Sequence, residues 1–230
     1  MTLAALIFDV DGTLAETEES HRQAFNGAFA AAGLDWRWDQ ALYRELLQVA
    51  GGVERMRHFA ATHRERRQLG EPELRAIHRE KTARFVARAA HHRPRPGVAR
   101  LVAEARAAGL RLAIATTTAR ANVAALLTAC GGEAWFDVIA TAEDAARKKP
   151  DPAIYAVALG RLGLPAAGCL AFEDTRNGLA AARAAGVPVA ITFSQYGERD
   201  GFDGAVAVVP DLAAVDLAQL RAWHAAARQR

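Results

Sequence analysis

Residues 5–21 read ALIFDVDGTLAETEESH, an apolar run that stops at two aspartates, Asp9 and Asp11. Successive side chains of a strand point to opposite faces, so the two carboxylates share one side while Val10 points to the other. Two like charges held this close repel, and they need a cation, a shared proton or open water. Active sites supply the first two of these. The stretch therefore predicts a buried strand that ends in a functional pair of carboxylates.

The composition predicts a soluble, enzyme-sized globular protein. The chain has 230 residues, of which 51% are hydrophobic and 24% charged. Its apolar runs are strand-length, far short of the roughly 20 residues that span a bilayer, and no basic flank precedes a signal-type segment. The two cysteines, Cys130 and Cys169, lack CxxC spacing and are expected to be buried thiols of a reducing compartment. We therefore expect a cytoplasmic protein with no membrane partner.

Charge is unevenly distributed along the chain. The net charge is +3, but residues 54–95 hold 12 Lys and Arg against 5 Asp and Glu, and the remainder is mildly acidic. The basic segment has few aromatic residues to stack on bases and no nucleic-acid-binding motif, so we expect no nucleic acid partner. A face of this kind is better suited to attracting a small, multiply charged anion.

The chain divides into a helical segment and an α/β part. From about residue 17 to about residue 90, alanine-, leucine- and arginine-rich patterns predict helices, the first at 17–32, without an intervening strand. The sequence HHRPRPG at 91–97 interrupts them, and beyond it short continuous apolar runs alternate with helical patterns. We predict an α/β fold, a doubly wound parallel sheet formed by residues 1–14 and 94–230, with an all-helical cap domain at 15–93 inserted after the first strand.

Polar residues follow the predicted strands at the sheet edge where doubly wound folds bind ligands. The expected strands after the first span 110–117, 136–141, 169–174, 187–192 and 205–209. The residues at or just beyond the ends of these strands and of the first are Asp9, Asp11, Thr116, Thr117, Thr118, Lys148, Lys149, Glu173, Asp174 and Asn177. Carboxylates, hydroxyls and lysines therefore converge on one edge of the sheet.

This set of side chains suits phosphoryl transfer. Asp9 can attack phosphorus to form an aspartyl-phosphate, and Asp11 can protonate the leaving oxygen and later activate water. Asp174 completes a site for Mg²⁺, which prefers oxygen ligands, and Lys149 neutralises the carboxylates and the phosphate. Taken singly, each residue has a structural explanation as a turn, a helix cap or a solvated loop charge. Their coincidence at successive strand ends favours the catalytic interpretation.

With these motifs the sequence resembles the haloacid dehalogenase-like phosphatase superfamily. The matching pieces are DVDGT at 9–13, Thr116 after an apolar strand, Lys149 in KPDP, and EDTRNG at 173–178, in the order of the superfamily. The resemblance implies that Asp9 is the nucleophile and Asp11 the acid and base, with Thr116 and Lys149 binding phosphate. It also implies an Mg²⁺ held by Asp9, Asp11 through its main-chain oxygen, and Asp174. Glu173 is expected to act through water or behind the direct ligands.

The helical insertion resembles the small cap of phosphoglycolate phosphatases, β-phosphoglucomutases and CbbY-type sugar bisphosphatases. TLAETEESHRQAF, YRELLQVAGGVER, IHREKT, IATTTARANV and KKPDPAIY are most similar to the CbbY type. This resemblance implies hydrolysis of xylulose-1,5-bisphosphate, an inhibitory by-product of the Calvin cycle enzyme Rubisco. The sequence departs from the pattern at Val53, where GGVER replaces the expected GGKER, and the missing cation puts the identity of the substrate in question.

The cap is expected to recognise the far end of a phosphorylated sugar. Glu16 and His21 lie at its entry, Gly51, Gly52 and Arg55 form a loop that can approach a ligand closely, and His78 and Lys81 share a helix face. From the core, we expect substrate contacts from Thr117, Thr118, Asn122 and Asn177. We expect the cap to close over the bound sugar phosphate and exclude bulk water.

Three other functions are compatible with parts of the pattern, and one of them is that of a phosphoglycolate-type phosphatase, which has the same kind of small cap. A phosphoacceptor receiver module is also a doubly wound sheet with an aspartate and Mg²⁺, but its aspartate follows a middle strand of a chain about half as long, without a cap. A sugar-phosphate mutase uses nearly the same site as a phosphatase and differs only in which molecule accepts the phosphoryl group. No long heptad or large uninterrupted apolar face is present, so we expect a monomer.

Overall fold

A six-stranded parallel sheet forms the centre of the computed structural model, which describes residues 2–63, 67–197 and 199–228. The strand order is β3-β2-β1-β4-β5-β6. The strands are β1 (Ala5–Phe8), β2 (Arg111–Ala115), β3 (Val138–Ala140), β4 (Cys169–Glu173), β5 (Val189–Thr192) and β6 (Ala207–Val209). Because β1 lies between β2 and β4, the chain builds the sheet outward in both directions, and the carboxyl ends of all six strands lie at one edge. The predicted doubly wound sheet is confirmed.

Both faces of the sheet are covered by helices, as continuous apolar strands require. One face packs against α5 (Val98–Ala107), α6 (Arg120–Cys130) and α9 (Leu217–Ala227). The other packs against α7 (Ala153–Leu162) and α8 (Arg176–Ala184). Side chains of β1 alternate between the two faces. Leu6 and Phe8 pack on the first face, and Ala5 and Ile7 pack on the second. The stacked rings of Phe8 and Phe172, with centroids 4.7 Å apart, join β1 to β4.

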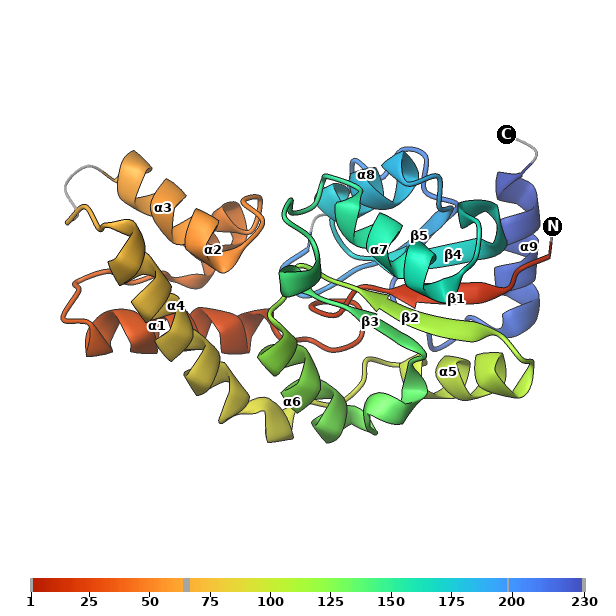
Figure 1. Cartoon of the computed structure of the whole chain (residues 1–230), viewed down its shortest axis with the longest axis horizontal. Coiled ribbons are helices and arrows are strands. Elements are labelled where there is room, and N and C mark those ends of the chain that lie inside the picture. Colours follow the sequence, from red (N-terminus) through yellow and green to blue (C-terminus); the bar gives the residue numbers. More distant parts are fainter. Residues whose placement is uncertain (1, 64–66, 198, 229–230) are drawn as a thin grey trace.

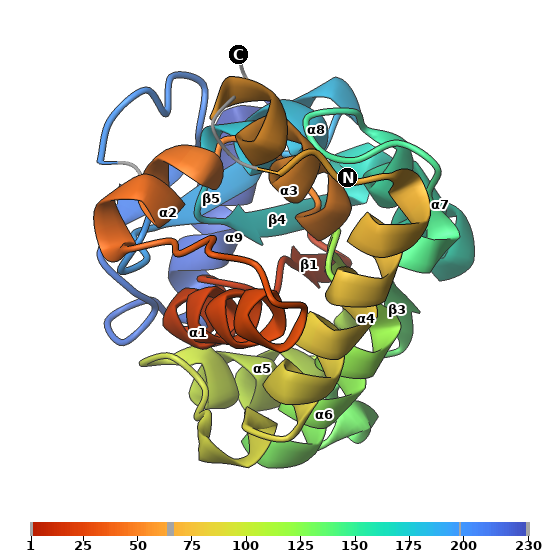
Figure 2. The same cartoon turned by 90° about the vertical axis from the view of Figure 1, so that its left-hand side faces the viewer.

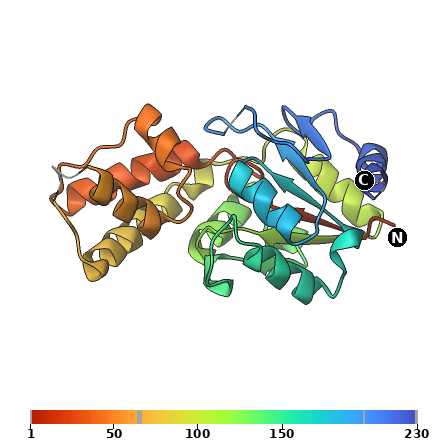
Figure 3. The ribbon, with the colours of Figure 1, turned by 90° about the horizontal axis from the view of Figure 1, so that it is seen from above.

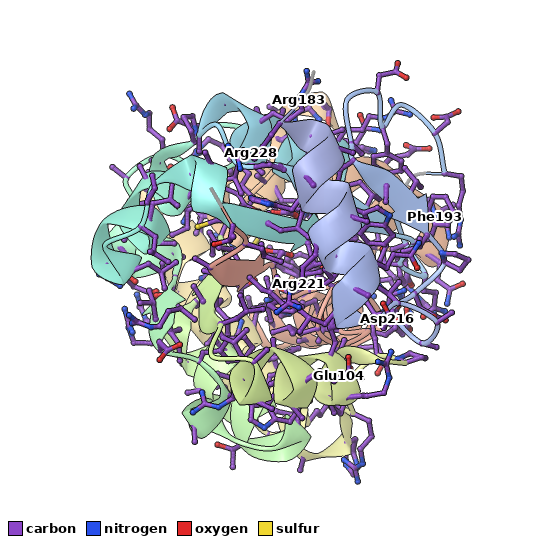
Figure 4. The ribbon with its side chains drawn as sticks, turned by 90° about the vertical axis from the view of Figure 1, so that its right-hand side faces the viewer. Glu104, Arg183, Phe193, Asp216, Arg221 and Arg228 are labelled. Atoms are coloured by element: carbon purple, nitrogen blue, oxygen red, sulfur yellow. The ribbon has the colours of Figure 1, made fainter. Side chains whose placement is uncertain are left out.

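The start of β1 and the helix α9 (Leu217–Ala227) lie at the end of this α/β lobe that is remote from the helical segment (Figure 1). Figure 4 shows α9, which carries Arg221, at that end of the molecule. Asp216 caps α9 by accepting a hydrogen bond from the backbone of Gln219 at 2.8 Å. The ligand-binding edge of the sheet is therefore the opposite end, which faces the helical segment.

The helical segment forms a second lobe, which we call the cap (Figures 1 and 3). Its helices are α1 (Glu18–Ala31), α2 (Gln40–Leu46), α3 (Gly52–Thr62) and α4 (Glu71–Val86). Short 3₁₀ turns follow at η1 (Ala89–His91), and in the other lobe at η2 (Glu133–Trp135), η3 (Ala142–Asp144) and η4 (Ala166–Gly168). The described part of the cap contains helices and no strand, as the sequence predicts.

The cap has an apolar interior of its own. Aromatic side chains from α1 and from the segment after it dominate this interior, with Trp38 in contact with the rings of Phe25, Phe29 and Phe59 at centroid distances of 4.7, 4.8 and 5.6 Å. Figure 2 shows α1 and α4 packed against each other at an angle, on the viewer's side of the sheet. An interior separate from the sheet allows the cap to keep its shape while it is joined to the sheet by two linkers. The domain boundaries at 14/15 and 93/94 remain a prediction.

None of the helices that the structure describes is long and apolar enough to cross a membrane.

Candidate active site

A cavity of about 660 Å³ lies between the carboxyl edge of the sheet and the cap. The sequence-predicted site residues that line it are Asp9, Asp11, His21, Gly51, Gly52, Arg55, His78, Lys81, Thr116, Thr117, Thr118, Asn122, Lys149, Glu173, Asp174 and Asn177. Residues more than 160 positions apart in the sequence therefore share one cavity, because parallel strands end at the same edge.

Glu16 is the predicted site residue that the structure does not bring to the cavity. Its carboxylate is exposed and lies 3.0 Å from Nε of Arg95. It also accepts a hydrogen bond from the backbone of Gln195 at 3.1 Å. Glu16 and Arg95 belong to the two linkers between the lobes, so in this arrangement Glu16 joins the linkers instead of facing a substrate.

Lys149 holds two buried carboxylates on the floor of the cavity. Its Nζ donates to Oδ1 of Asp9 and to Oε1 of Glu173, both at 2.6 Å, and the hydroxyl of Tyr155 donates to the same Glu173 oxygen at 2.5 Å. Burial alone lowers the pKa of Lys149, but the two carboxylates outweigh it and raise that pKa. Lys149 is therefore an ammonium ion placed beside the carboxylate that is expected to attack phosphorus.

Asp174 completes a cluster of three carboxylates that is suited to a metal ion. One oxygen each from Asp9, Glu173 and Asp174 lies within 4.8 Å of the others, and all three residues are buried. Burial and the charge of Asp9 raise the pKa of Asp174 well above its usual value, which marks a carboxylate in need of a cation. Gly12 allows the close approach, since a Cβ at this residue would lie 2.1 Å from Oδ2 of Asp174. Hard oxygen donors in this arrangement fit Mg²⁺.

Asp11 is held by side chains from both lobes. Its Oδ1 accepts from the hydroxyl of Thr17 at 2.5 Å and from Nε2 of His21 at 2.9 Å, and its Oδ2 accepts from the hydroxyl of Thr118. Burial would raise the pKa of Asp11, but His21 and the hydroxyl hydrogen bonds outweigh it and lower that pKa. In this arrangement Asp11 is a carboxylate, the form required of a base that activates water.

Lys81 determines which nitrogen of His21 carries the proton. Nζ of Lys81 lies 2.8 Å from Nδ1 of His21, and burial together with Lys81 lowers the pKa of His21 to about 4. The neutral ring therefore accepts from Lys81 on Nδ1 and donates to Asp11 from Nε2. Burial also lowers the pKa of Lys81, to about 8, which leaves it charged at neutral pH. The three side chains form a chain of hydrogen bonds from the cap to the reacting centre.

The turn after β2 presents hydroxyl groups to the cavity. The hydroxyl of Thr116 accepts from the backbone of Thr118 at 3.2 Å, which fixes the turn, and Thr116 and Asn122 are both buried. Oδ1 of Asn122 has no hydrogen-bond partner among the described residues. An unpartnered buried acceptor at the edge of a cavity is a candidate contact for a hydroxyl group of a ligand.

The opposite wall, formed by the cap, carries the cationic side chains of Arg44, Arg55, Arg57, Arg75 and Lys81. Nε of Arg55 donates to the carbonyl of Leu46 at 3.0 Å and its Nη1 to the hydroxyl of Tyr43 at 3.2 Å. The pKa of His78 falls to about 4 because of burial, Lys81 and His21, with smaller effects of Lys148 and Arg55. Gly52 allows His78 to pack against the loop, since a Cβ at this glycine would lie 2.5 Å from its Nε2. Such a wall favours an anionic group of a ligand.

Asn177 bridges the two lobes beside the cavity. Its Nδ2 donates to the carbonyl of Gln48 in the cap at 3.0 Å. The side chain therefore joins the two lobes at a place where it also lines the cavity.

Sequence reasoning missed several residues of the site. Thr17 precedes the first cap helix, where a threonine usually caps the backbone, yet it makes no capping bond and its hydroxyl goes to Asp11. Ser194 follows β5 and lies beside Asp174, so the strand-end rule applied to that strand would have found it. Glu18, whose Oε2 accepts from Tyr43 at 2.7 Å, and Tyr196 also line the cavity. Glu18 lies within TLAETEESHRQAF without having been predicted as a site residue, and no motif marks Tyr196.

The chain belongs to the haloacid dehalogenase-like hydrolase family, whose sequence model matches residues 3–186. CbbY from Rhodobacter capsulatus is 54% identical over 222 residues, covering 93% of this chain and 96% of that protein. The crystal structure of CbbY from Rhodobacter sphaeroides in complex with phosphate has a TM-score of 0.88 and 47% identity, covering 95% of this chain and 99% of the other. The crystal structure of a variant of that protein in complex with xylulose-1,5-bisphosphate has a TM-score of 0.88 and 46% sequence identity, with the same coverage of both chains. These findings confirm a CbbY-type phosphatase.

Proposed function

We propose that the enzyme is a magnesium-dependent phosphatase that converts xylulose-1,5-bisphosphate to xylulose 5-phosphate through an aspartyl-phosphate on Asp9. The observation that carries the proposal is the position of Asp9, which lies 2.6 Å from Lys149 and within a metal-type carboxylate cluster. The cationic cap wall across the same cavity provides for a second phosphate. The CbbY relative that binds xylulose-1,5-bisphosphate supports the choice of substrate.

The reaction takes place in two displacements. A carboxylate oxygen of Asp9 forms a bond to phosphorus as the bond from phosphorus to the sugar oxygen breaks, and a proton from Asp11 goes to that oxygen. Asp11 then takes a proton from water, whose oxygen attacks phosphorus, releases phosphate and restores Asp9. Lys149 and Thr116 bind the oxygens of the transferred group throughout, which stabilises the charge of the transition state.

The lowered pKa of Asp11 keeps it deprotonated in this arrangement, which is the form that the second displacement requires. For the first, Asp11 has to carry a proton, so we propose that substrate binding moves it away from the hydroxyls of Thr17 and Thr118 that hold it as a carboxylate. The acid role then depends on the cap, because Thr17 and His21 both reach Asp11 from the cap side.

We assign the Mg²⁺ site to Asp9, Asp174 and the main-chain oxygen of Asp11, with Glu173 behind them. When bound, Mg²⁺ would neutralise charge on the transferred phosphoryl group. Oε1 of Glu173 accepts hydrogen bonds from Lys149 and Tyr155, so we assign Glu173 to orienting Lys149 instead of direct metal binding.

The second phosphate is assigned to the cap, with Arg55 as its main ligand and His78 and Lys81 beside it. Arg55 uses Nε and Nη1 within the cap and has no further hydrogen bond to the described residues, so part of its guanidinium is available. Val53 lines the same cavity without contributing a charge. A bisphosphate would therefore be held by fewer cations here than in a chain with the GGKER sequence.

A phosphorylated-sugar panel tests the proposal. Purified enzyme with Mg²⁺ is incubated with xylulose-1,5-bisphosphate, β-glucose 1-phosphate and phosphoglycolate, and both free phosphate and isomerised sugar phosphate are measured. We expect phosphate release with the bisphosphate as the best substrate. Isomerised product in excess of free phosphate would replace the proposal by a mutase, and preference for phosphoglycolate would replace it by a phosphoglycolate-type phosphatase. A cytoplasmic location and a monomeric state complete the proposal.

A further inference from the structure

A loop of the α/β lobe reaches into the interior of the cap. This loop, FSQYG at 193–197, follows β5 and carries Tyr196, which is only 3% exposed. The ring of Tyr196 belongs to the apolar interior of the cap and meets the ring of Tyr43 edge-on, with centroids 5.7 Å apart. The guanidinium of Arg44 lies 5.4 Å from the Tyr196 ring centroid, and the Tyr196 hydroxyl donates to Oε2 of Glu19 in α1.

The same loop packs against the carboxylate cluster. A Cβ added to Gly12 would lie 2.8 Å from Cβ of Ser194 as well as 2.1 Å from Oδ2 of Asp174. A Cβ added to Gly197 would lie 2.5 Å from Oγ of Ser194 and 3.2 Å from the carbonyl oxygen of Asp174. The loop therefore packs closely against Asp174 at Ser194 and Gly197, so we expect a displacement of the loop at Tyr196 to be felt at Asp174.

Both linkers between the lobes also hold this loop. The backbone of Gln195 donates to Glu16 of the first linker at 3.1 Å, and Arg95 of the second linker donates to the carbonyl of Phe193. Glu16 and Arg95 pair with each other at 3.0 Å, and Arg95 is buried. The loop is thus bound at its start by the linkers and at its end by the cap.

We propose that Tyr196 is a positioning residue, and that the loop 193–197 is a third connection that sets how the cap sits over the carboxylate cluster. A charge-assisted hydrogen bond to Glu19 and aromatic packing against Tyr43 hold it in the cap. Tyr43 is also the hydrogen-bond partner of Glu18 and Arg55, so the connection extends to the cap wall that faces the substrate. The inference rests on the proposed function only for its choice of substrates.

The connection matters most for a substrate that touches both lobes. A sugar bisphosphate needs its two ends held at a fixed separation, whereas p-nitrophenyl phosphate is bound through its single phosphate by the core. Loss of the connection should therefore reduce turnover of the first substrate selectively. A purely structural role of Tyr196 in folding the cap or the site would reduce both.

The decisive variants are Tyr196→Phe, which keeps the ring and removes the hydroxyl, and Glu19→Gln, which removes the charge of its acceptor. Glu80→Gln serves as the matched control, since Glu80 is a cap carboxylate paired with Arg84 at 2.7 Å, away from the loop. We measure kcat and KM for both substrates with Mg²⁺. Hydrogen exchange of residues 16–20 and 193–197 reports on the connection without substrate.

We expect Tyr196→Phe and Glu19→Gln each to lower kcat/KM for the bisphosphate about 5- to 20-fold and that for p-nitrophenyl phosphate less than about 2-fold. The double variant should lose little more than Glu19→Gln alone, because Glu19→Gln already weakens the Tyr196 hydrogen bond together with the ion pair between Glu19 and Arg22. Exchange should become faster in both segments, and Glu80→Gln should change neither readout. Tyr196→Ala should show the same selectivity with a larger loss.

Equal losses on both substrates, additive effects in the double variant, or unchanged exchange in Tyr196→Phe would overturn the inference. A direct contact of the Tyr196 hydroxyl with substrate would give a selective loss in Tyr196→Phe that Glu19→Gln does not share. If the unmodified enzyme hydrolyses p-nitrophenyl phosphate but not the bisphosphate, the proposed substrate fails. The exchange measurement then decides on the connection by itself.

Discussion

Nζ of Lys149 lies 2.6 Å from Oδ1 of Asp9, and both side chains are buried. Replacing Lys149 by methionine leaves Asp9 and Glu173 without their shared cation and the transferred phosphoryl group without a ligand. We expect Lys149→Met to lower kcat/KM for p-nitrophenyl phosphate by roughly a thousandfold, in line with the loss of a buried electrostatic contact in a transition state. Steady-state kinetics at saturating Mg²⁺ measure this effect.

Lys148 provides the control for this variant. It is the neighbouring residue in the same loop and also lines the cavity, but its Nζ is near the carbonyl of Ala142 at 3.5 Å instead of a carboxylate. Lys148→Met should change the same parameter by less than about tenfold. Similar losses in the two variants would mean that the loop, and not the charge of Lys149, is what the reaction requires.

Gly12→Ala should weaken the metal site without a general loss of folding. Its Cβ would lie 2.1 Å from Oδ2 of Asp174, so the carboxylate has to move away from the cluster. Gly109→Ala is the matched control, because its φ of +76° nearly equals the +77° of Gly12 and its Cβ would meet nothing within 4 Å. Both variants carry the strain of a left-handed residue, of order 1 kcal/mol.

Titration of activity with Mg²⁺ separates these two effects. We expect Gly12→Ala to raise the half-saturating concentration of Mg²⁺ at least about tenfold and Gly109→Ala to leave it unchanged within about twofold. Thermal unfolding should show a loss of stability in both, and a larger one in Gly12→Ala, whose Cβ also meets Asp174 and Ser194. An unchanged Mg²⁺ requirement in Gly12→Ala would argue against Asp174 as a metal ligand.

His78 should make the protein less stable in mild acid. Its pKa falls from the usual 6.5 to about 4 on folding, mainly because of burial, so the unfolded chain binds more protons between these values. Stability contributed by the neutral ring is therefore present above pH 6.5 and is lost as the pH falls toward 4. His21 acts in the same direction, with a pKa also lowered to about 4 by burial and by Lys81.

Urea unfolding at about pH 7.5 and about pH 5 tests this linkage. The unfolding free energy of the unmodified enzyme should fall as the pH is lowered from about 7.5 to about 5. In His78→Gln this fall should be smaller by about 1–2 kcal/mol. His58→Gln, at an exposed position of the cap, should follow the unmodified enzyme. The same pH dependence in all three proteins would show that the ring of His78 is not kept neutral by the fold.

Arg55 should discriminate between one and two phosphates. A guanidinium contact to phosphate is worth about 1.5–3 kcal/mol, so Arg55→Ala should lower kcat/KM for xylulose-1,5-bisphosphate by one to two decades. On p-nitrophenyl phosphate, which has no second phosphate, we expect a change below about threefold. Arg79→Ala, at an exposed residue of the same lobe, is the control. Equal losses of Arg55→Ala on both substrates would remove the bisphosphate assignment and leave the phosphatase.

Val53→Lys is the complementary change. Val53 lines the cavity beside Arg55, and a lysine at this position adds a cation to the same wall. We expect a lower KM for the bisphosphate and no change for p-nitrophenyl phosphate. A loss on both substrates would show that the lysine disturbs the cap, and a loss on the bisphosphate alone would indicate that this chain uses the position for a different sugar.

The sequence was sufficient for the sheet because its signals are local and repeated. Each strand from β1 to β6 is a short, mostly apolar run. Because the strands are parallel, polar residues at the carboxyl ends of β1, β2 and β4 lie at the same edge of the sheet. Thr17 was missed because a threonine before a helix has a local role as a cap, and only the fold shows that its hydroxyl goes to Asp11 instead.

The cap side was harder to predict because its contacts depend on how the two lobes meet. Glu16 was expected at the substrate, but Arg95, almost 80 residues away in the sequence, pairs with it outside the cavity. Tyr196 follows a core strand and packs inside the cap, which no periodicity reveals. His78 and Lys81, by contrast, were found from their helical spacing, since both belong to one helix that faces the sheet edge.

The most direct test of the account is to identify the residue that carries the phosphoryl group during turnover. Enzyme mixed with Mg²⁺ and xylulose-1,5-bisphosphate is quenched in acid within one turnover, digested, and analysed by mass spectrometry. We predict one added phosphoryl group on the peptide that contains Asp9, and neither this adduct nor phosphate release in Asp9→Asn, because an amide cannot attack phosphorus. A phosphoryl group on another residue, or near-native turnover by Asp9→Asn, would contradict the assignment of Asp9 as the nucleophile.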